Sequence, residues 1–160
     1  EKLIPLMIVN ALRGKALPVY GQGANVRDWI HVDDHASGLL TVLERGAKGE
    51  CYLIGADAER RNIEVVNEIC AHLDELLPDS AFRPHADLIS YVEDRPGHDL
   101  RYSIDASKIR SELGWRPQVS FADGLRNTVA WYVDNRNWWE PMLSERYSGQ
   151  RLGLVNGGPA

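Results

Sequence analysis

The chain has 160 residues, 44% of them hydrophobic and 26% charged, which is typical of one globular domain and excludes a disordered, collagenous or coiled-coil chain. Lys and Arg number 18 against 23 Asp and Glu, giving a formal net charge of -5 without a basic run, so we expect no nucleic-acid partner. The longest mainly apolar run, 3–9, is far shorter than the roughly 20 residues of a membrane-spanning helix, so we expect no membrane partner either.

The two cysteines, Cys51 and Cys70, form no CxxC pair and stand in apolar surroundings. This usage predicts two buried, reduced thiols in a cytoplasmic protein. The chain opens at Glu1 without an initiator Met, and Asn10 and Arg13 interrupt what would be the apolar region of a signal peptide. We interpret the first residue as a cut within a longer protein.

The first half of the chain predicts two helices and two strands. Apolar residues at helical spacing precede Gly14, which suits the end of a helix. After a loop marked by glycines, an alternating segment predicts a strand, and Asp33 and Asp34 are expected to cap the next helix. The predicted elements are a helix over 3–13, a strand over 27–32, a helix over 33–46 and a buried strand over 51–54.

The second half predicts three more helices and two strands. Asn62 is expected to cap the third helix, and Ser120 with Asp123 forms a capping-box-like start for the last one. The helical period is lost beyond Trp139, and 148–160 is expected to be a mobile tail. The predicted elements are helices over 62–77, 105–114 and 120–139 and strands over 88–92 and 101–104, so the fold class is mixed α/β. We expect Trp115 to pack its helix against a neighbour, and Trp131, Trp138 and Trp139 to lie in the core or at a domain interface.

Several motifs that resemble functional sites are rejected on physical grounds. The Gly21-Gln22-Gly23 segment leads into a strand, whereas a dinucleotide-binding turn must open a helix. His31 and His35 flank two aspartates, but the passage from strand to helix scatters these side chains, so we predict no metal site. The sequence holds no GxSxG nucleophile motif and no Tyr followed four residues later by Lys, and we assign no catalytic residue to this chain.

Three segments together carry a specific resemblance: RDWIHVDDH at 27–35, DRPGHD at 94–99 and LGWRP at 113–117. They resemble the C-terminal half of the dTDP-glucose 4,6-dehydratase family, which belongs to the extended short-chain dehydrogenases. The opening EKLIPL and the LPVYG segment at 17–21 fit the same family. The resemblance covers 1–147 in order and without large gaps, and it is closer than the likeness to related epimerases and decarboxylases.

The resemblance implies a mixed α/β fold made mainly of the small substrate-binding domain, with elements near 33–54 that return to the Rossmann domain. It implies a reaction on bound NAD in which the sugar is oxidised at C4, water is lost across C5 and C6, and hydride returns to C6, giving dTDP-4-keto-6-deoxyglucose. The family's N-terminal NAD-binding domain, with its catalytic residues, is absent from this chain. The isolated chain is therefore expected to be inactive and unstable or self-associating, with apolar surface exposed. We expect the full-length enzyme to be a homodimer.

A nucleotide diphosphate needs cationic donors, and a guanidinium is their best geometric match. The resemblance carries the family's substrate contacts onto ten positions: Lys2, Leu3, Pro18, Val19, Tyr20, Arg27, Asn62, Arg95, His98 and Tyr147. Structural alternatives stay open, because Arg27 could pair with a nearby carboxylate and Asn62 could serve only as a helix cap. Two other functions also stay open: a related NAD-dependent nucleotide-sugar epimerase or decarboxylase, and a non-catalytic subunit that binds nucleotide sugars.

Overall fold

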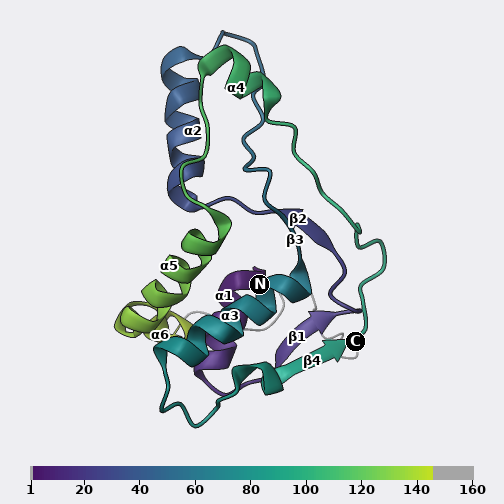
Figure 1. The fold of residues 1–160 in the computed structure, drawn as a ribbon, viewed down its shortest axis with the longest axis vertical. Helices are drawn as coiled ribbons and strands as arrows, with labels where there is room; N and C mark the ends of the chain where they lie inside the picture. Colours follow the sequence, from purple (N-terminus) through teal and green to yellow (C-terminus); the bar gives the residue numbers. More distant parts are fainter. Residues whose placement is uncertain (1, 146–160) are drawn as a thin grey trace, which may run out of the picture.

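Helices and short strands alternate along the part of the chain that the computed structural model describes, residues 2–145. Figure 1 shows two groups of elements at opposite ends of the molecule: α2 and α4 lie together at one end, and α1, α3, β1 and β4 lie at the other. The elements in chain order are α1 (Leu3–Leu12), β1 (Leu17–Tyr20), β2 (Val26–Asp28), α2 (Val32–Arg45), β3 (Glu59–Arg61), α3 (Asn62–Leu76), the 3-10 helix η1 (His85–Leu88), β4 (Ile89–Val92), α4 (Ser107–Leu113), α5 (Phe121–Asp134) and α6 (Arg136–Glu145).

The strands form two small sheets, which confirms the mixed α/β class. Parallel pairing of β1 and β4 sets Leu17 opposite Ile89, and antiparallel pairing of β2 and β3 sets Val26 opposite Arg61. Val26 also forms a single parallel bridge with Arg101. Because of these pairings, β2 lies between β3 and the 99–102 segment.

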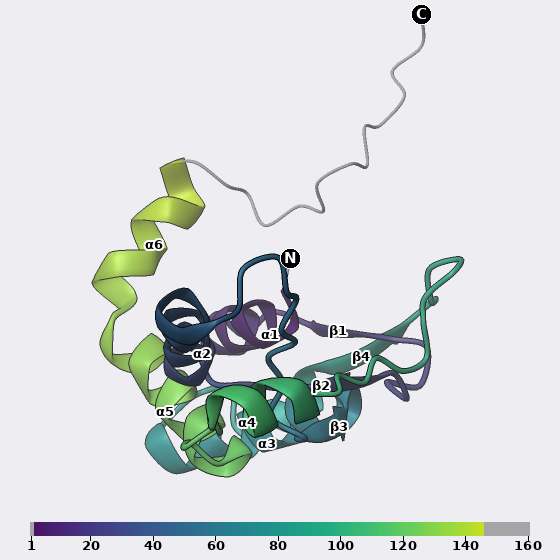
Figure 2. The ribbon, with the colours of Figure 1, turned by 90° about the horizontal axis from the view of Figure 1, so that it is seen from above.

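The main core lies where α1, α3 and α5 pack together and against β1 (Figure 2). Helix α3 supplies its centre because apolar residues recur on one face of the helix and are fully buried. The core residues are Met7, Ile8, Ala11, Leu12, Leu17, Val19, Val65, Val66, Ile69, Cys70, Leu73, Leu125, Val129 and Trp139.

A second, smaller cluster joins α2 to α4 and the segment after it. Ala106, Ile109, Leu113 and Trp115 are its buried members, so the predicted packing role of Trp115 is confirmed. The opposite face of α2 exposes large apolar side chains, which agrees with the expectation that this chain has exposed apolar surface. The exposed fractions are 71% for Val32, 53% for Leu39, 58% for Leu40 and 82% for Leu43.

Several predicted helix ends are confirmed, and two caps are wrong. Gly14 follows the C-cap residue of α1, Arg13, and has the left-handed backbone angle φ +62°. At the start of α5, the Ser120 hydroxyl accepts the N–H of Asp123. Helix α2 is capped by His31, whose Nδ1 accepts the N–H of Asp33, and not by the aspartates. Helix α3 is preceded by Arg61, whose N–H bonds to the Glu64 carboxylate at 2.8 Å, so Asn62 is the first helical residue and not the cap.

The strand predictions fail where the sequence pattern is short. Residues 51–54 form no strand, and Cys51 is exposed instead of buried, whereas Cys70 is buried as predicted. The loop that follows residues 51–54 is held by the Asp28 carboxylate, which accepts hydrogen bonds from the N–H groups of Ala56 and Ala58. Of the predicted strand 101–104 only the bridge at Arg101 forms, while β3 was not predicted.

The predicted helix 120–139 is divided in the structure, where α5 ends at Asp134 and α6 begins at Arg136. The part of α6 beyond Trp139 was not predicted, because the periodic pattern breaks there. In the structure Trp139 is 4% exposed and its indole N–H donates to the Tyr132 carbonyl at 2.8 Å, which fixes α6 against α5. Trp131 and Trp138 are 42% and 56% exposed, so neither is a core residue. Within residues 2–145, no helix is long and apolar enough to cross a membrane. The predicted tail 148–160 lies outside the described residues.

Candidate functional site

Two of the predicted substrate residues meet at the edge of β2. Arg27 lies in this strand, and its Nη2 lies 3.1 Å from Nε2 of His98, which comes from the 93–99 loop more than 70 positions later. The same Nη2 donates to the Asp99 carbonyl at 3.0 Å, and Nη1 donates to the Val26 carbonyl at 2.6 Å. These partners are carbonyl oxygens and a ring nitrogen of His98. The structural alternative, an ion pair between Arg27 and a carboxylate, is therefore not what the structure shows.

Aromatic rings surround this pair. The ring of Tyr20, at the end of β1, meets the His98 ring edge to face with centroids 6.2 Å apart. The Arg27 guanidinium carbon lies 4.3 Å from the centre of the Tyr102 ring. Tyr102 was not predicted as a site residue. The arrangement places a cation and a partly exposed aromatic side chain within one small region, as a nucleotide ligand requires.

The 93–99 loop carries charges of both signs. Asp94 Oδ1 lies 2.6 Å from Nδ1 of His98, whose side chain is 8% exposed. This hydrogen bond from His98 lowers the pKa of Asp94 despite an opposing effect of desolvation, and the charge of Arg95 lowers it further. Arg95 itself is exposed, one position from Asp94. Asp94 was missed because only its spacing of four from His98 signals the contact.

The other predicted residues lie at varying distances from the cluster formed by Arg27, His98 and Tyr20. Val19 is 1% exposed and its side chain belongs to the main core, so only its backbone can face a ligand, and Pro18 lies beside it in β1. Asn62 is partly buried, and its Oδ1 is buried without a hydrogen-bond partner. Its N–H bonds to the Asn25 carbonyl at 2.9 Å, which places it next to the loop before β2. Tyr147 lies outside the described residues.

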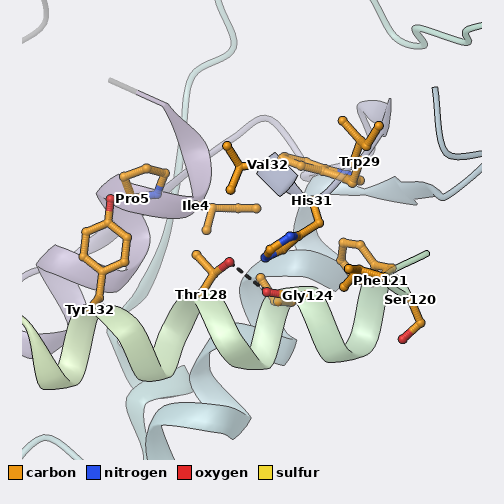
Figure 3. A pocket seen from close by; sticks show the side chains of 13 residues that line it. Ile4, Pro5, Trp29, His31, Val32, Ser120, Phe121, Gly124, Thr128 and Tyr132 are labelled. Carbon is orange, nitrogen blue, oxygen red and sulfur yellow. Dashed lines mark hydrogen bonds between the residues drawn. The ribbon is translucent and has the colours of Figure 1, made fainter. Parts of the chain in front are cut away.

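Lys2 and Leu3 lie at the start of α1, beside a half-open pocket of about 250 Å³. Figure 3 shows Ile4, Val32 and His31 facing Thr128 and Tyr132 of α5 across this pocket. Gly124 allows His31 to lie against α5, because a Cβ at this position would be 3.1 Å from the His31 ring. Trp29, two positions after Arg27, also lines the pocket. The sequence held no pattern that predicted this pocket.

The rejected Gly21-Gln22-Gly23 motif forms a turn that leads into β2, not into a helix. Gly23 has φ +67°, and a Cβ there would lie 2.7 Å from Cβ of Ile63 and 2.8 Å from Cγ1 of Val19. The glycine therefore serves close packing between β1 and α3. Within the described residues, the His, Cys, Asp and Glu side chains form no group of three that could hold a metal ion.

Similar proteins place this arrangement in a family. The chain is 54% identical over 157 residues to a dTDP-glucose 4,6-dehydratase from Escherichia coli, and 55% identical over 155 residues to one from Neisseria meningitidis. These matches cover 97% and 96% of this chain but 43% and 44% of the relatives, so the chain spans less than half their length.

Solved structures agree with the sequence comparison. The dTDP-glucose 4,6-dehydratase DesIV from Streptomyces venezuelae, solved with NAD bound, has a TM-score of 0.76 and 51% identity over 88% of this chain and 41% of its own. An epimerase from Methanothermobacter thermautotrophicus has a TM-score of 0.72 and 29% identity over 91% of this chain and 40% of its own. The sequence model of the GDP-mannose 4,6 dehydratase family matches residues 1–128, and the chain therefore belongs to this family, within the extended short-chain dehydrogenases.

Proposed function

We propose that this chain is the nucleotide-sugar-binding portion of a dTDP-glucose 4,6-dehydratase. The full-length enzyme would convert dTDP-glucose to dTDP-4-keto-6-deoxyglucose and water. The observation that carries the proposal is the convergence of Arg27, His98 and Tyr20 from three separate segments, with Arg27 and His98 3.1 Å apart. Relatives of that name at 54% and 55% identity support it.

The chemistry of the cluster suits a nucleoside diphosphate. Arg27 keeps its positive charge without a carboxylate partner, and the exposed Arg95 adds a second charge on the same loop as His98. Guanidinium groups match phosphate oxygens geometrically and hold charge at any physiological pH. Tyr20 offers an aromatic face at the end of β1 for a nucleobase. The unpaired Oδ1 of Asn62 suits a hydrogen-bond donor of the ligand.

The Gly21-Gln22-Gly23 turn does not fit the phosphates of NAD, because it leads into β2 and not into a helix, and Gly23 packs against Ile63 and Val19. We therefore place NAD and the catalytic residues in an N-terminal half outside this chain, and we expect the chain alone to be inactive. The exposed face of α2, with Leu39, Leu40 and Leu43, is the surface on which that half would pack.

The full-length enzyme is proposed to be a homodimer, by its resemblance to the family. We also propose a cytoplasmic location, which the two free thiols of Cys51 and Cys70 support. The dehydratase function is favoured over that of a related epimerase or decarboxylase, since the dehydratase structure has 51% identity and the epimerase structure 29% over similar shares of the chain.

Calorimetric titration of the chain with dTDP and UDP tests the proposal, with circular dichroism as the check on folding. We expect saturable binding that prefers dTDP and that is lost in Arg27→Ala and Arg95→Ala. Arg101→Ala is the matched control, because this exposed arginine is one position from Tyr102 but is held by Glu59 at 2.6 Å and 2.9 Å. Binding that is equally strong without Arg27 and Arg95 would refute the proposed site. A folded chain that binds neither nucleotide would refute the non-catalytic binding subunit and would mean that the site needs the missing half.

A further inference from the structure

We propose that Tyr102 and Asp94 are positioning residues for Arg27: the Tyr102 ring supports the face of the guanidinium, and Asp94 holds its edge through His98. The inference rests on the proposed function, since it concerns how the phosphate-binding arginine is held before the ligand arrives. Neither residue was among the predicted site residues. Both lie in the 93–102 segment, which pairs in parallel with β2 at Val26, the residue before Arg27.

The backbone brings the Tyr102 ring to Arg27. Val26 donates its N–H to the Leu100 carbonyl at 2.7 Å and accepts the N–H of Tyr102 at 3.1 Å, so this segment extends the β2 pairing. The guanidinium carbon of Arg27 then lies 4.3 Å from the centre of the ring. Stacking of this kind is attractive because the ring face is negative and the guanidinium is planar.

The Tyr102 ring is itself held in place. Its hydroxyl donates to the Asp99 carboxylate, and this bond raises the pKa of Tyr102. The carbonyl of the same Asp99 accepts from Nη2 of Arg27 at 3.0 Å. Asp99 therefore connects the ring and the guanidinium on a single loop residue, which fixes their relative position.

The second support is Asp94, which determines which ring nitrogen of His98 carries the proton. A guanidinium only donates hydrogen bonds, so Nε2 of His98 must accept from Arg27, at 3.1 Å. The ring proton then resides on Nδ1, which donates to Asp94 Oδ1 at 2.6 Å. Asp94 thus selects the tautomer in which His98 accepts a bond from Arg27.

The benefit of these supports is preorganisation. An arginine that is free in solution loses side-chain conformations when it binds a phosphate, and this loss weakens binding by about 2- to 10-fold for one such side chain. Arg27 is already held on its face by Tyr102 and on its edge by His98 and the Asp99 carbonyl. Removal of either support should therefore weaken dTDP binding about 2- to 10-fold without removing any charge that touches the ligand.

A double-mutant cycle in the full-length protein tests whether these residues act through Arg27. In the full-length enzyme, unlike the isolated chain, the remaining nucleotide contacts should keep dTDP binding measurable without Arg27. We expect Tyr102→Leu and Asp94→Ala each to weaken dTDP binding about 2- to 10-fold when Arg27 is present, and less than about 2-fold in the Arg27→Ala background. Tyr102→Phe keeps the ring and should rescue most of the loss. Penalties of equal size in both backgrounds would mean a general structural role and would overturn the inference.

Tyr52→Leu is the matched control. The Lys108 ammonium lies 4.9 Å from the centre of the Tyr52 ring and the Tyr52 hydroxyl donates to Glu112, so it copies the cation, ring and carboxylate arrangement in the α2 and α4 part of the molecule. We expect dTDP affinity to stay within about 2-fold of wild type. A loss equal to that of Tyr102→Leu would show that any such stack matters only for folding, against the inference.

A readout without ligand separates this inference from the proposed function. Nitrogen-15 NMR of the His98 ring should show the proton on Nδ1 in the wild type and a shift toward the other tautomer in Asp94→Ala. If the wild type carries the proton on Nε2, the positioning arrangement is wrong whatever dTDP does. If the tautomer is as expected but dTDP does not bind, the arrangement holds and the choice of ligand is what fails.

Discussion

Asp34 and Asp33 stand side by side in the first turn of α2, yet the structure predicts very different effects of removing them. Asp34 is 4% exposed, and its two oxygens accept the backbone N–H groups of Gln118 and Val119, each at 2.9 Å. The side chain of Asp33 is 83% exposed. Since both carboxylates have the same sequence context at a helix start, a difference between their variants isolates the two buried hydrogen bonds.

The size of the effect follows from those two bonds. A hydrogen bond to a charged group contributes about 1.5–3 kcal/mol, so Asp34→Ala should cost about 3–6 kcal/mol and leave two N–H groups without their acceptors. Asp33→Ala loses the interaction with the helix dipole, about 0.3–1 kcal/mol, and an exposed contact with His31 at 3.7 Å that adds little. Ser37→Ala provides an intermediate case of about 1 kcal/mol, because it removes one neutral bond from the Trp115 indole at 2.9 Å.

Hydrogen exchange of the Gln118 and Val119 amides, with the melting temperature of the same samples, measures this difference. An effect of about 3–6 kcal/mol corresponds to exchange that is roughly 100- to 30,000-fold faster in Asp34→Ala. Asp33→Ala should leave these amides within about 5-fold of wild type. If the two alanine variants exchange at similar rates, the buried carboxylate does not hold the 114–120 segment, and the reasoning is wrong.

Two further predictions concern titratable groups on α3. Burial raises the pKa of Cys70 to about 11, so roughly 0.1% of its thiol is ionised at pH 8. A thiol reagent should therefore label the exposed Cys51 quickly and Cys70 only on unfolding. Rapid labelling of both cysteines would contradict the burial of Cys70. Burial alone would raise the pKa of Asp74, but hydrogen bonds from the His85 side chain and N–H outweigh it and lower this pKa. The ionised Asp74 carboxylate therefore stabilises the fold above about pH 4, and this stabilisation is lost as the pH falls further. The melting temperatures of wild type and Asp74→Asn should converge below about pH 4. A constant difference between the two melting temperatures at all pH values would contradict the Asp74–His85 interaction.

The sequence was most informative where one segment determines its own structure. Helices α1, α3 and α5 were predicted because a full apolar face repeats at helical spacing, and Gly14 and Ser120 mark their ends with residues that suit those positions. Strand β3 was missed because Glu59–Arg61 is three polar residues whose only reason to be extended is the pairing with β2. Such a strand has no local pattern to detect.

The candidate site divides in the same way. Arg27 and His98 were predicted from motifs, and the structure brings them within hydrogen-bond distance. The Tyr102 ring meets Arg27 only once the 93–102 segment has paired with β2, and Asp94 is linked to Arg27 only through His98. Tyr102 also carries no charge that would single it out as a phosphate contact. Its position, and not its chemistry, makes it a candidate.

The architecture explains why binding and chemistry can be separated in this chain. The cluster around Arg27 is built on β2, which pairs with β3 next to α3 and is therefore connected to the main core. Helix α2 begins four positions after the end of that strand, and its exposed Val32, Leu39 and Leu43 face away from the second cluster. A domain that buried these side chains would be held close to the bound nucleotide by the short 29–31 connection. Under the proposed function, this geometry would let a separate domain bring its own catalytic groups to a nucleotide sugar whose diphosphate is bound at Arg27.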